Sequence, residues 1–321
     1  MEYFYLDKKS SKKNYMKMKL EKGIAEIDLK INNLLRIFID KVRPIFLKDF
    51  FLIVFFCLLN VIFLNGQYSN EIKSHSISSP FQKESTTIRI LLPDQFSINK
   101  KYKVLYVLPV REQGNKKSGD PLIEIMKDDL HNKYKLICVF PGYTHLPWYA
   151  NHSIDKTKQD ESHFLKTVLP FVDENYPTIR GKEGRLLMGF SKSGWGALTL
   201  LLRNPEIFNK AAGWDIGIRM DTNVPADSLF VKAAESTFGD LENFEKYRVS
   251  SLLKKNKDKL GMTSRIFYYN TGGNRARGGT VIHKLMVELE IPHLYLYEPK
   301  RKHRWDSGWI PEAINFLVEN E

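Results

Sequence analysis

From about residue 85 onward, the chain alternates between short apolar runs and longer amphipathic segments. Most of the apolar runs are continuous and lack a polar residue at every second position, which is typical of strands covered on both faces of a sheet. The predicted strands cover 87–92, 103–109, 135–140, 185–190, 210–215, 265–271 and 293–298.

Segments with apolar residues at helical spacing lie between most of these runs. The predicted helices cover 162–175, 192–203, 226–236, 241–256, 278–290 and 309–319. Strands that alternate with helices in this way favour a mainly parallel sheet with helices on both faces. We therefore expect a single α/β domain over residues 85–321, which is long enough to bury a substantial core.

The pattern is different before residue 85. Residues 1–49 form a basic extension, and an apolar run broken only by Asn60, FFLIVFFCLLNVIFL, then begins at Phe50 and ends at Leu64. This run is shorter than the roughly 20 residues of a membrane-spanning helix, and it matches the core of a secretory signal. We interpret residues 50–66 as a signal-peptide core or a membrane anchor, and the polar residues 67–84 as a linker.

Either interpretation of the apolar run predicts export of the α/β domain to a periplasmic or extracellular location. A segment that is not cleaved would also attach the protein to a membrane through residues 50–64. The basic region before the run is long for a signal peptide, and it includes apolar residues at helical spacing from Ile31 to Phe46. Two explanations stay open, namely an uncleaved anchor whose basic side remains in the cytoplasm and a start that lies upstream of the true one.

Composition and charge narrow the classes of function. Of the 321 residues, 43% are apolar and 27% are charged, proportions that exclude a disordered or fibrous chain. The two cysteines exclude a disulfide scaffold. The net charge of +12 suggests an anionic partner, but residues 1–66 hold 12 positive and 7 negative side chains. The rest of the chain therefore keeps only +7, without a basic–aromatic motif, and we expect no nucleic-acid partner.

The segment RLLMGFSKSGWGALTLLLRNP carries the clearest chemical signal. An apolar strand ends in GFSKSG at residues 189–194 and a helix begins at once, which is the context of the nucleophile elbow G-x-S-x-G. The elbow needs small residues two places on either side of its serine. Gly189 meets this requirement around Ser191, and Ser193 stands where the second glycine is expected. If Ser193 were the nucleophile, the bulky Trp195 would occupy such a position, so we assign Ser191; a plain helix cap is the alternative.

A serine hydroxyl needs a histidine that removes its proton. Of the eight histidines, His303 alone lies between the last predicted strand and the last predicted helix. That loop is where the base belongs when the three catalytic residues follow the order serine, acid, histidine. His283 falls inside a helix and His293 at the start of a strand, so we give both a structural role. His303 is therefore the predicted base.

The acid that orients the histidine is less directly indicated. Its usual place is the loop after the strand that precedes the penultimate helix, but residues 270–275 hold no carboxylate. Asp215, at the end of the strand that follows the nucleophile helix, is the best substitute, because a loop one strand over can still reach the histidine. Asp306 and Glu298 remain alternatives.

An oxyanion hole should combine two backbone N–H groups. One comes from Lys192, the residue after the nucleophile. The other comes from the loop after strand 103–109, and since Pro109 has no N–H, Val110 or Arg111 must donate it. We favour Arg111.

Aromatic side chains near these positions are candidates for contact with substrate. The loop 140–152 follows the carboxyl end of a strand, where ligand sites of α/β proteins lie. We assign Trp148 and Tyr149 from this loop, together with Trp195, as substrate-lining residues; packing within the domain is the alternative. No cluster of His, Cys, Asp or Glu has metal-ligand spacing, so we expect neither a metal nor a cofactor.

These residues together make the chain resemble the esterase-D-like branch of the α/β-hydrolases. That branch includes S-formylglutathione hydrolases, enterochelin and feruloyl esterases, and mycolyltransferases. The similarity covers about residues 85–320 and rests on GFSKSGWGAL, on the preceding strand VLYVLP, and on His303-Arg304-Trp305 followed by a helix. It implies the α/β-hydrolase fold and ester hydrolysis through an acyl-enzyme. The chain departs from the family pattern at Ser193, at Pro109-Val110 where a His-Gly pair is usual, and in the missing loop acid.

The leading hypothesis is an exported serine esterase that acts on a small-molecule ester, such as an acylated carbohydrate or a small thioester. An acyltransferase of the mycolyltransferase type, in which a sugar hydroxyl replaces water, is the second enzyme hypothesis. A catalytically weak binding module on the same fold is the rival from another class, because the family's acid and oxyanion residues are altered.

Overall fold

The computed structural model describes residues 23, 26–34, 36, 72–113, 116–216, 228–270 and 276–319. The chain divides into two compact units, Met1–Tyr68 and Ser69–Glu321. In the first unit the described residues are helical. The predicted export segment, residues 50–66, lies outside the described residues. Within the described residues, no helix combines the length and the apolar character needed to cross a bilayer.

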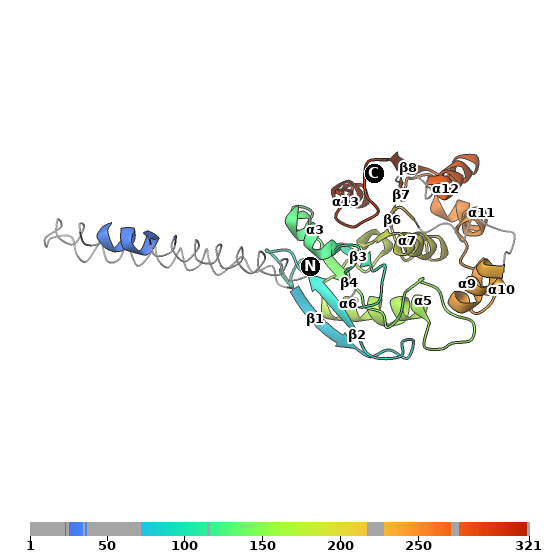
Figure 1. The fold of residues 1–321 in the computed structure, drawn as a ribbon, viewed down its shortest axis with the longest axis horizontal. Coiled ribbons are helices and arrows are strands. Elements are labelled where there is room, and N and C mark those ends of the chain that lie inside the picture. The colour runs from blue at the N-terminus through green and yellow to red at the C-terminus, as the bar shows by residue number, and fades with distance from the viewer. Residues whose placement is uncertain are drawn as a thin grey trace, which may run out of the picture. The chain divides into compact units, whose positions relative to one another are not determined.

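The second unit is built on one eight-stranded sheet with the order β1-β2-β4-β3-β5-β6-β7-β8 (Figure 1). The first two strands pair antiparallel with each other, and β2 also pairs antiparallel with β4, whereas all pairs from β4 to β8 are parallel. The strands are β1 (Ile72–Ile77), β2 (Thr86–Leu91), β3 (Val104–Leu108), β4 (Ile137–Phe140), β5 (Arg185–Phe190), β6 (Lys210–Trp214), β7 (Ile266–Asn270) and β8 (His293–Tyr297).

Helices cover both faces of this sheet, as the alternating sequence pattern predicts (Figure 1). They are α3 (Pro121–Lys127), α4 (Leu130–Lys133), α5 (Asp160–His163), α6 (Leu169–Asn175), α7 (Lys192–Arg203), α9 (Ser228–Phe238), α10 (Leu241–Glu245), α11 (Val249–Leu260), α12 (Ala276–Glu288) and α13 (Ile310–Val318). A π-helical turn, Phe164–Val168, joins α5 to α6, and a 3-10 turn, Lys182–Gly184, precedes β5.

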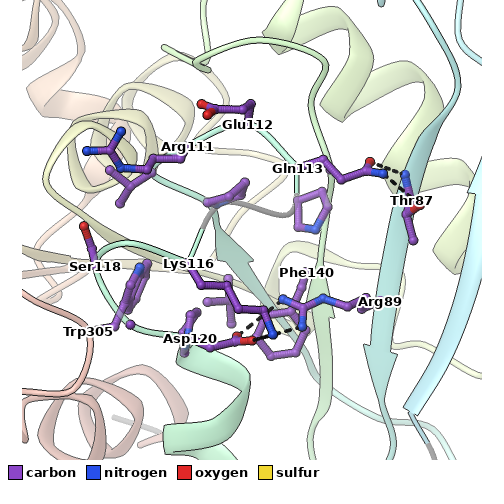
Figure 2. Close-up of a pocket in the computed structure, with 17 residues that line it drawn as sticks. Thr87, Arg89, Arg111, Glu112, Gln113, Lys116, Ser118, Asp120, Phe140 and Trp305 are labelled. Carbon is purple, nitrogen blue, oxygen red and sulfur yellow. Dashed lines mark hydrogen bonds and ion pairs between the residues drawn. The ribbon is translucent and has the colours of Figure 1, made fainter. Parts of the chain in front are cut away.

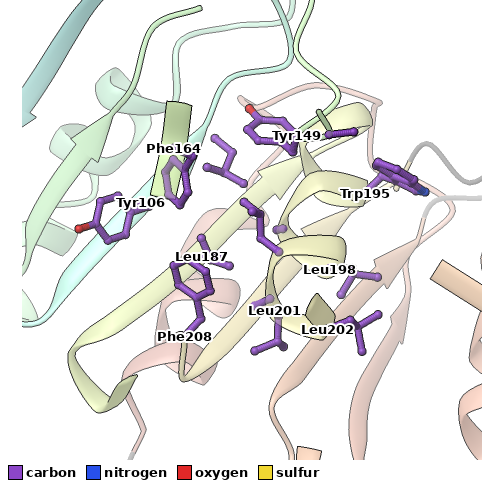
Figure 3. Packing of buried hydrophobic residues seen from close by; sticks show 14 of the residues in the cluster. Tyr106, Tyr149, Phe164, Leu187, Trp195, Leu198, Leu201, Leu202 and Phe208 are labelled. Atoms are coloured by element: carbon purple, nitrogen blue, oxygen red, sulfur yellow. The ribbon is translucent and has the colours of Figure 1, made fainter. Parts of the chain in front are cut away.

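Alternation along the central strands builds two hydrophobic clusters, one on each face. In β3, Tyr106 joins the cluster under α7, whereas its neighbours Leu105 and Val107 join the cluster under α3 and α13. Figure 3 shows the first cluster, in which Leu198 and Leu201 of α7 pack among the side chains of the sheet. Burial on both faces explains why these strands read as continuous apolar runs.

The structure corrects three expectations. The predicted linker, 67–84, is partly wrong, because Ile72–Ile77 forms the edge strand β1 paired with β2. Most of its side chains are polar, because a strand at the edge of a sheet with one exposed face buries few residues. The predicted helix 241–256 is two helices, since Arg248 is extended between them. Helices α3 and α4 were not expected at all, and both are short.

The parallel pairing of the strands brings the predicted site residues to one edge of the sheet. Strands β3, β5 and β6 run side by side in the same direction, so the loops that follow their carboxyl ends meet at one edge of the sheet. Those loops carry the predicted oxyanion residue, nucleophile and acid.

Candidate active site

The nucleophile turn has the expected strand–turn–helix form. Ser191 lies between the end of β5 and the start of α7, and its backbone has φ +55° and ψ −121°, in a region that residues with side chains rarely adopt. Gly189 is required, because a Cβ there would lie 2.0 Å from the Ser193 carbonyl oxygen. Ser193 replaces the second glycine and closes the turn: its hydroxyl lies 2.9 Å from both the N–H and the carbonyl oxygen of Phe190.

The structure brings the three predicted catalytic side chains together. The Nε2 atom of His303 lies 3.1 Å from the hydroxyl oxygen of Ser191, and its Nδ1 atom lies 2.8 Å from Oδ2 of Asp215. With a proton on Nδ1, His303 donates to the carboxylate and accepts from the serine hydroxyl. This is the geometry in which a histidine can remove the serine proton.

Asp215 reaches the histidine from the residue immediately after β6. Its backbone has φ +44°, and its N–H donates to the carbonyl oxygen of Tyr269 at 2.8 Å. Its side chain is completely buried, so the carboxylate faces His303 away from water. The alternatives are placed otherwise: Asp306 pairs with Arg304 at 2.7 Å, and Glu298 is exposed. In the loop where the acid was first sought, residues 271–275 lie outside the described residues.

Aromatic packing holds the histidine loop against the nucleophile strand. The ring of Phe190, the residue before the nucleophile, lies 4.4 Å from the His303 ring and 5.5 Å from the Trp305 ring, centroid to centroid. The N–H of Trp305 donates to the carbonyl oxygen of Ser118 at 2.9 Å, which ties this loop to the segment before α3. The position of His303 therefore depends on packing as well as on its two polar contacts.

The two predicted oxyanion donors lie on neighbouring segments. Lys192 is the first residue of α7, so its N–H has no partner within the helix. Leu108 of β3 pairs with Gly189 of β5 in the parallel sheet. Arg111 and Lys192 each follow three residues later in the chain. The adjacent loop is fixed by the Tyr149 hydroxyl, which donates to the Pro109 carbonyl oxygen at 2.6 Å.

A cavity of about 310 Å³ opens between the loop after β3, the end of β4 and the start of α3 (Figure 2). Arg111 and Trp305 line it, which places it next to the histidine and oxyanion loops. Elsewhere in the cavity wall, Arg89 and Lys116 both pair with the buried Asp120, at 3.2 and 2.7 Å. Their charges are thus largely compensated, whereas no acidic side chain among the described residues pairs with Arg111.

Comparison with known proteins identifies the fold. A family model called Esterase matches residues 131–214, a stretch that includes Ser191. A curated esterase of Mycobacterium tuberculosis is 29% identical over 114 residues, which are 35% of this chain and 25% of that protein. The matched region thus spans about a quarter of that relative's length.

Solved structures give a longer match. An S-formylglutathione hydrolase from Staphylococcus aureus has a TM-score of 0.63 at 14% identity, covering 78% of this chain and 99% of that one. A ferulic acid esterase has a TM-score of 0.59 at 20% identity, covering 77% and 96%. The protein has the α/β-hydrolase fold. The predicted fold class and the resemblance to the esterase-D-like branch are confirmed.

Two of the three residues predicted to line the substrate site are buried in the core instead. Tyr149 and Trp195 are both 0% exposed, so neither can touch a ligand in this conformation. Large aromatic side chains in a loop can serve the core as readily as a ligand. Trp148 is half-buried, stacks edge-on against Trp195 at 5.6 Å, and lines a second cavity of about 310 Å³. It therefore remains a candidate for substrate contact.

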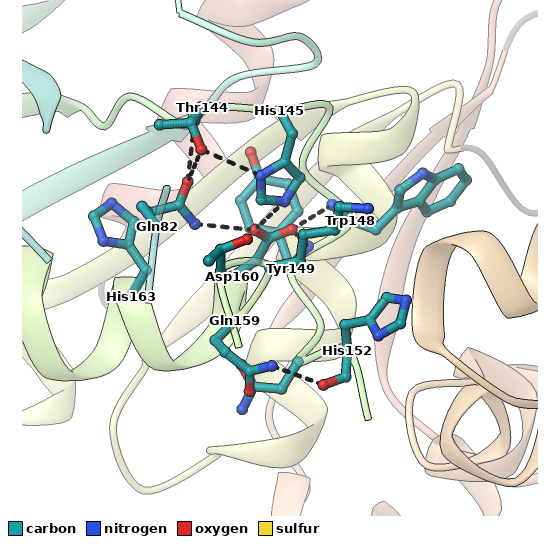
Figure 4. A network of polar contacts seen from close by, with 12 residues as sticks. Gln82, Thr144, His145, Trp148, Tyr149, His152, Gln159, Asp160 and His163 are labelled. Carbon is teal, nitrogen blue, oxygen red and sulfur yellow. Dashed lines mark hydrogen bonds and ion pairs between the residues drawn. The ribbon is translucent and has the colours of Figure 1, made fainter. Parts of the chain in front are cut away.

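A buried carboxylate that no sequence pattern singles out organises this aromatic loop (Figure 4). Asp160 accepts hydrogen bonds from the backbone N–H groups of Trp148 and Tyr149 at 2.9 and 3.2 Å. It also contacts His145 at 2.9 Å and Gln82 at 3.3 Å. These partners are far apart in sequence, so no local pattern could have revealed the network. Its effect is to hold Tyr149 in place beneath the oxyanion loop.

Proposed function

We propose that this α/β-hydrolase cleaves carboxylic esters through an acyl-enzyme formed on Ser191. The observation that carries the proposal is the continuous relay from Asp215 through His303 to the serine hydroxyl, with contacts of 2.8 and 3.1 Å. The family match over the nucleophile segment and the esterase names of its relatives support the same reaction.

In the first half of the reaction, His303 accepts the hydroxyl proton while Ser191 Oγ forms a bond to the ester carbonyl carbon. The carbonyl oxygen becomes an oxyanion, which the backbone N–H groups of Lys192 and Arg111 stabilise. The tetrahedral intermediate then breaks its bond to the alcohol oxygen. That oxygen takes the proton from His303 and leaves as the free alcohol.

In the second half, a water molecule attacks the carbonyl carbon of the acyl-enzyme and gives its proton to His303. Collapse of the second tetrahedral intermediate breaks the bond to Ser191 Oγ, which regains a proton from His303, and the carboxylic acid leaves. Asp215 keeps the proton on Nδ1 and stabilises the imidazolium in both halves. Its complete burial strengthens this interaction, because water does not screen it.

The test combines p-nitrophenyl ester hydrolysis with fluorophosphonate labelling. We expect the parent to hydrolyse short esters and to carry one label on Ser191, and we expect Ser191→Ala to lose both. Ser74→Ala, on the exposed side of the edge strand β1, is the matched control and should keep both. Esterase activity that survives in Ser191→Ala would overturn the proposal, and an unlabelled, inactive parent would favour the binding module. Capture of the acyl group by an added sugar at the expense of hydrolysis would identify an acyltransferase.

We also propose that the hydrolase unit acts outside the cytoplasm. The support is the sequence of residues 50–66, an apolar core after a basic region. Residues 1–70 placed before alkaline phosphatase, which is active only after export to an oxidising compartment, should give phosphatase activity. Two arginines in the apolar run, Val54→Arg with Leu58→Arg, should abolish it. An equally active reporter with and without the arginines would refute export by this segment.

A further inference from the structure

The side chain of Lys192 lies directly beside the nucleophile. It is half-buried, and its Nζ atom is 5.6 Å from the centre of the Trp148 ring. Lys192 forms no ion pair with any residue that the structure describes. Among those residues, no carboxylate lies within ion-pair distance of its ammonium group, although the Glu112 carboxylate is near enough to act on its pKa.

A second cation faces the same place. Arg111 follows β3 where Lys192 follows β5, and the Leu108–Gly189 pairing brings the two segments side by side. Arg111 is also one of the residues that line the cavity, together with Trp305 of the histidine loop (Figure 2). Its Nε atom is buried, and no described residue accepts a hydrogen bond from it. Burying a guanidinium N–H without a partner is costly, so this position favours an added acceptor.

The charges around Lys192 and Arg111 also favour an anionic ligand. Burial, and next the nearby Arg111 charge, lower the pKa of Lys192, and the carboxylate of Glu112 opposes this shift only in part. Lys192 and Arg111 are thus near enough for their charges to repel each other, with the Glu112 carboxylate also near Lys192. The other cations around His303 differ, because Arg301 pairs with Glu312 at 2.9 Å and Arg304 with Asp306 at 2.7 Å.

We propose that Lys192 and Arg111 select esters that carry a negatively charged group, a carboxylate or a phosphate, close to the scissile bond. Such a group relieves the repulsion between the two cations and accepts the hydrogen bond that Arg111 Nε lacks. Lys192 and Arg111 thereby each contribute two groups. The backbone N–H stabilises the oxyanion, and the side chain binds the negatively charged group of the substrate. This inference rests on the proposed esterase function and specifies its substrate class.

The test compares matched charged and neutral esters on the full chain. For an anion on the acyl side, the substrates are p-nitrophenyl hemisuccinate and p-nitrophenyl acetate. For an anion on the alcohol side, they are 4-acetoxybenzoate and 4-acetoxybenzamide. The quantity measured is the ratio of kcat/KM between the charged and the neutral ester of each pair, because intrinsic reactivity cancels when this ratio is compared between protein variants.

We expect Lys192→Gln and Arg111→Gln each to lower the charged-to-neutral ratio at least about fivefold for one of the pairs, the loss of one charge-assisted contact. Lys192→Arg should restore the ratio. Lys182→Gln is the matched control, because this exposed lysine lies before the amino end of the same strand, β5, far from the nucleophile. The pair that responds tells whether the anion belongs to the acid or to the alcohol.

Ratios unchanged by both Gln variants in both pairs would overturn this inference while leaving the esterase proposal intact. A parent that hydrolyses none of the four esters and takes no fluorophosphonate label would overturn the esterase proposal itself, and this inference with it. Loss of activity toward charged and neutral esters alike, with Lys192→Arg equally impaired, would also overturn it, because the side chain would then serve only the local structure.

Discussion

The Tyr149 hydroxyl donates a 2.6 Å hydrogen bond to the carbonyl oxygen of Pro109 and so connects the aromatic loop to the end of β3. Tyr149 is fully buried and adopts φ +57°. A residue with no access to solvent thus fixes the peptide plane next to the oxyanion donors. In the reaction that we propose, it acts through Pro109, as a positioning residue.

Tyr149→Phe should therefore lower kcat about five- to tenfold, the effect of losing one buried hydrogen bond, with little change in KM. The matched control is Tyr143→Phe, because Tyr143 packs against Tyr149 and its buried hydroxyl has no hydrogen-bond partner in the described part of the chain. Steady-state kinetics and thermal unfolding of both variants provide the check. Equal losses of kcat in the two variants would contradict the positioning role.

Asp215→Asn should reduce kcat by roughly 10³- to 10⁴-fold, because an amide favours the wrong histidine tautomer and cannot stabilise the imidazolium. The near-isosteric change should leave the far-UV circular dichroism spectrum unaltered. Asp306→Asn serves as the comparison: it removes a carboxylate close to His303 in sequence that pairs with Arg304 instead. A larger loss in Asp306→Asn than in Asp215→Asn would reassign the acid.

Some parts of the fold and the site can be predicted directly from the sequence, and others only as one choice among several. The strands and Ser191 follow from local patterns, since a strand, a tight turn and a helix occupy consecutive residues. The pairing of Asp215 with His303 spans 88 positions, so the sequence could only rank the acid among alternatives. Asp215 can reach His303 because the strand before it, β6, lies directly beside β5, the strand before Ser191.

The errors also have physical causes. Trp195 follows the nucleophile closely, yet its face of α7 packs inward, and no periodicity distinguishes an aromatic core residue from an aromatic ligand contact. The sequence of β1 predicts a linker, because a half-exposed edge strand carries little apolar signal. No sequence pattern predicts the role of Asp160, because its partners come from two separate segments of the chain, Gln82 and the loop that holds His145 and Trp148.

The preference for anionic esters should weaken as the pH rises. Because burial and Arg111 lower the pKa of Lys192, its ammonium loses the proton at a pH below the usual lysine range, whereas a substrate carboxylate stays ionised. We expect the charged-to-neutral ratio of kcat/KM to fall as the pH rises toward the usual lysine range. Lys192→Arg keeps its charge over this range, so its ratio should stay level. A parent ratio that stays as level as the variant's would contradict the role of the Lys192 charge.

Stability should also respond to acid through a buried histidine. Burial lowers the pKa of His163 from 6.5 to about 4, and its Nε2 atom lies 3.3 Å from the Gly142 carbonyl oxygen. Below pH 6.5 the unfolded chain takes up a proton that the folded protein refuses, so the free energy of unfolding falls as the pH drops toward 4.

This single group can account for a loss of about 3 kcal/mol over that range. His163→Gln keeps a donor for Gly142 but cannot titrate, so urea unfolding of the variant should depend less steeply on pH between 6.5 and 4. Parallel pH profiles for parent and variant would show that His163 is protonated equally in both states.

Ser191 and Asp215 both have a left-handed backbone, which lowers the folding stability of the protein at the two residues that its proposed chemistry needs. Glycine at either position would relax the main chain, yet it would also remove the nucleophile or the acid. Laboratory evolution for heat tolerance alone should therefore accept glycine at both ends of the relay. Only a selection that also demands turnover would keep serine and aspartate where the backbone prefers neither.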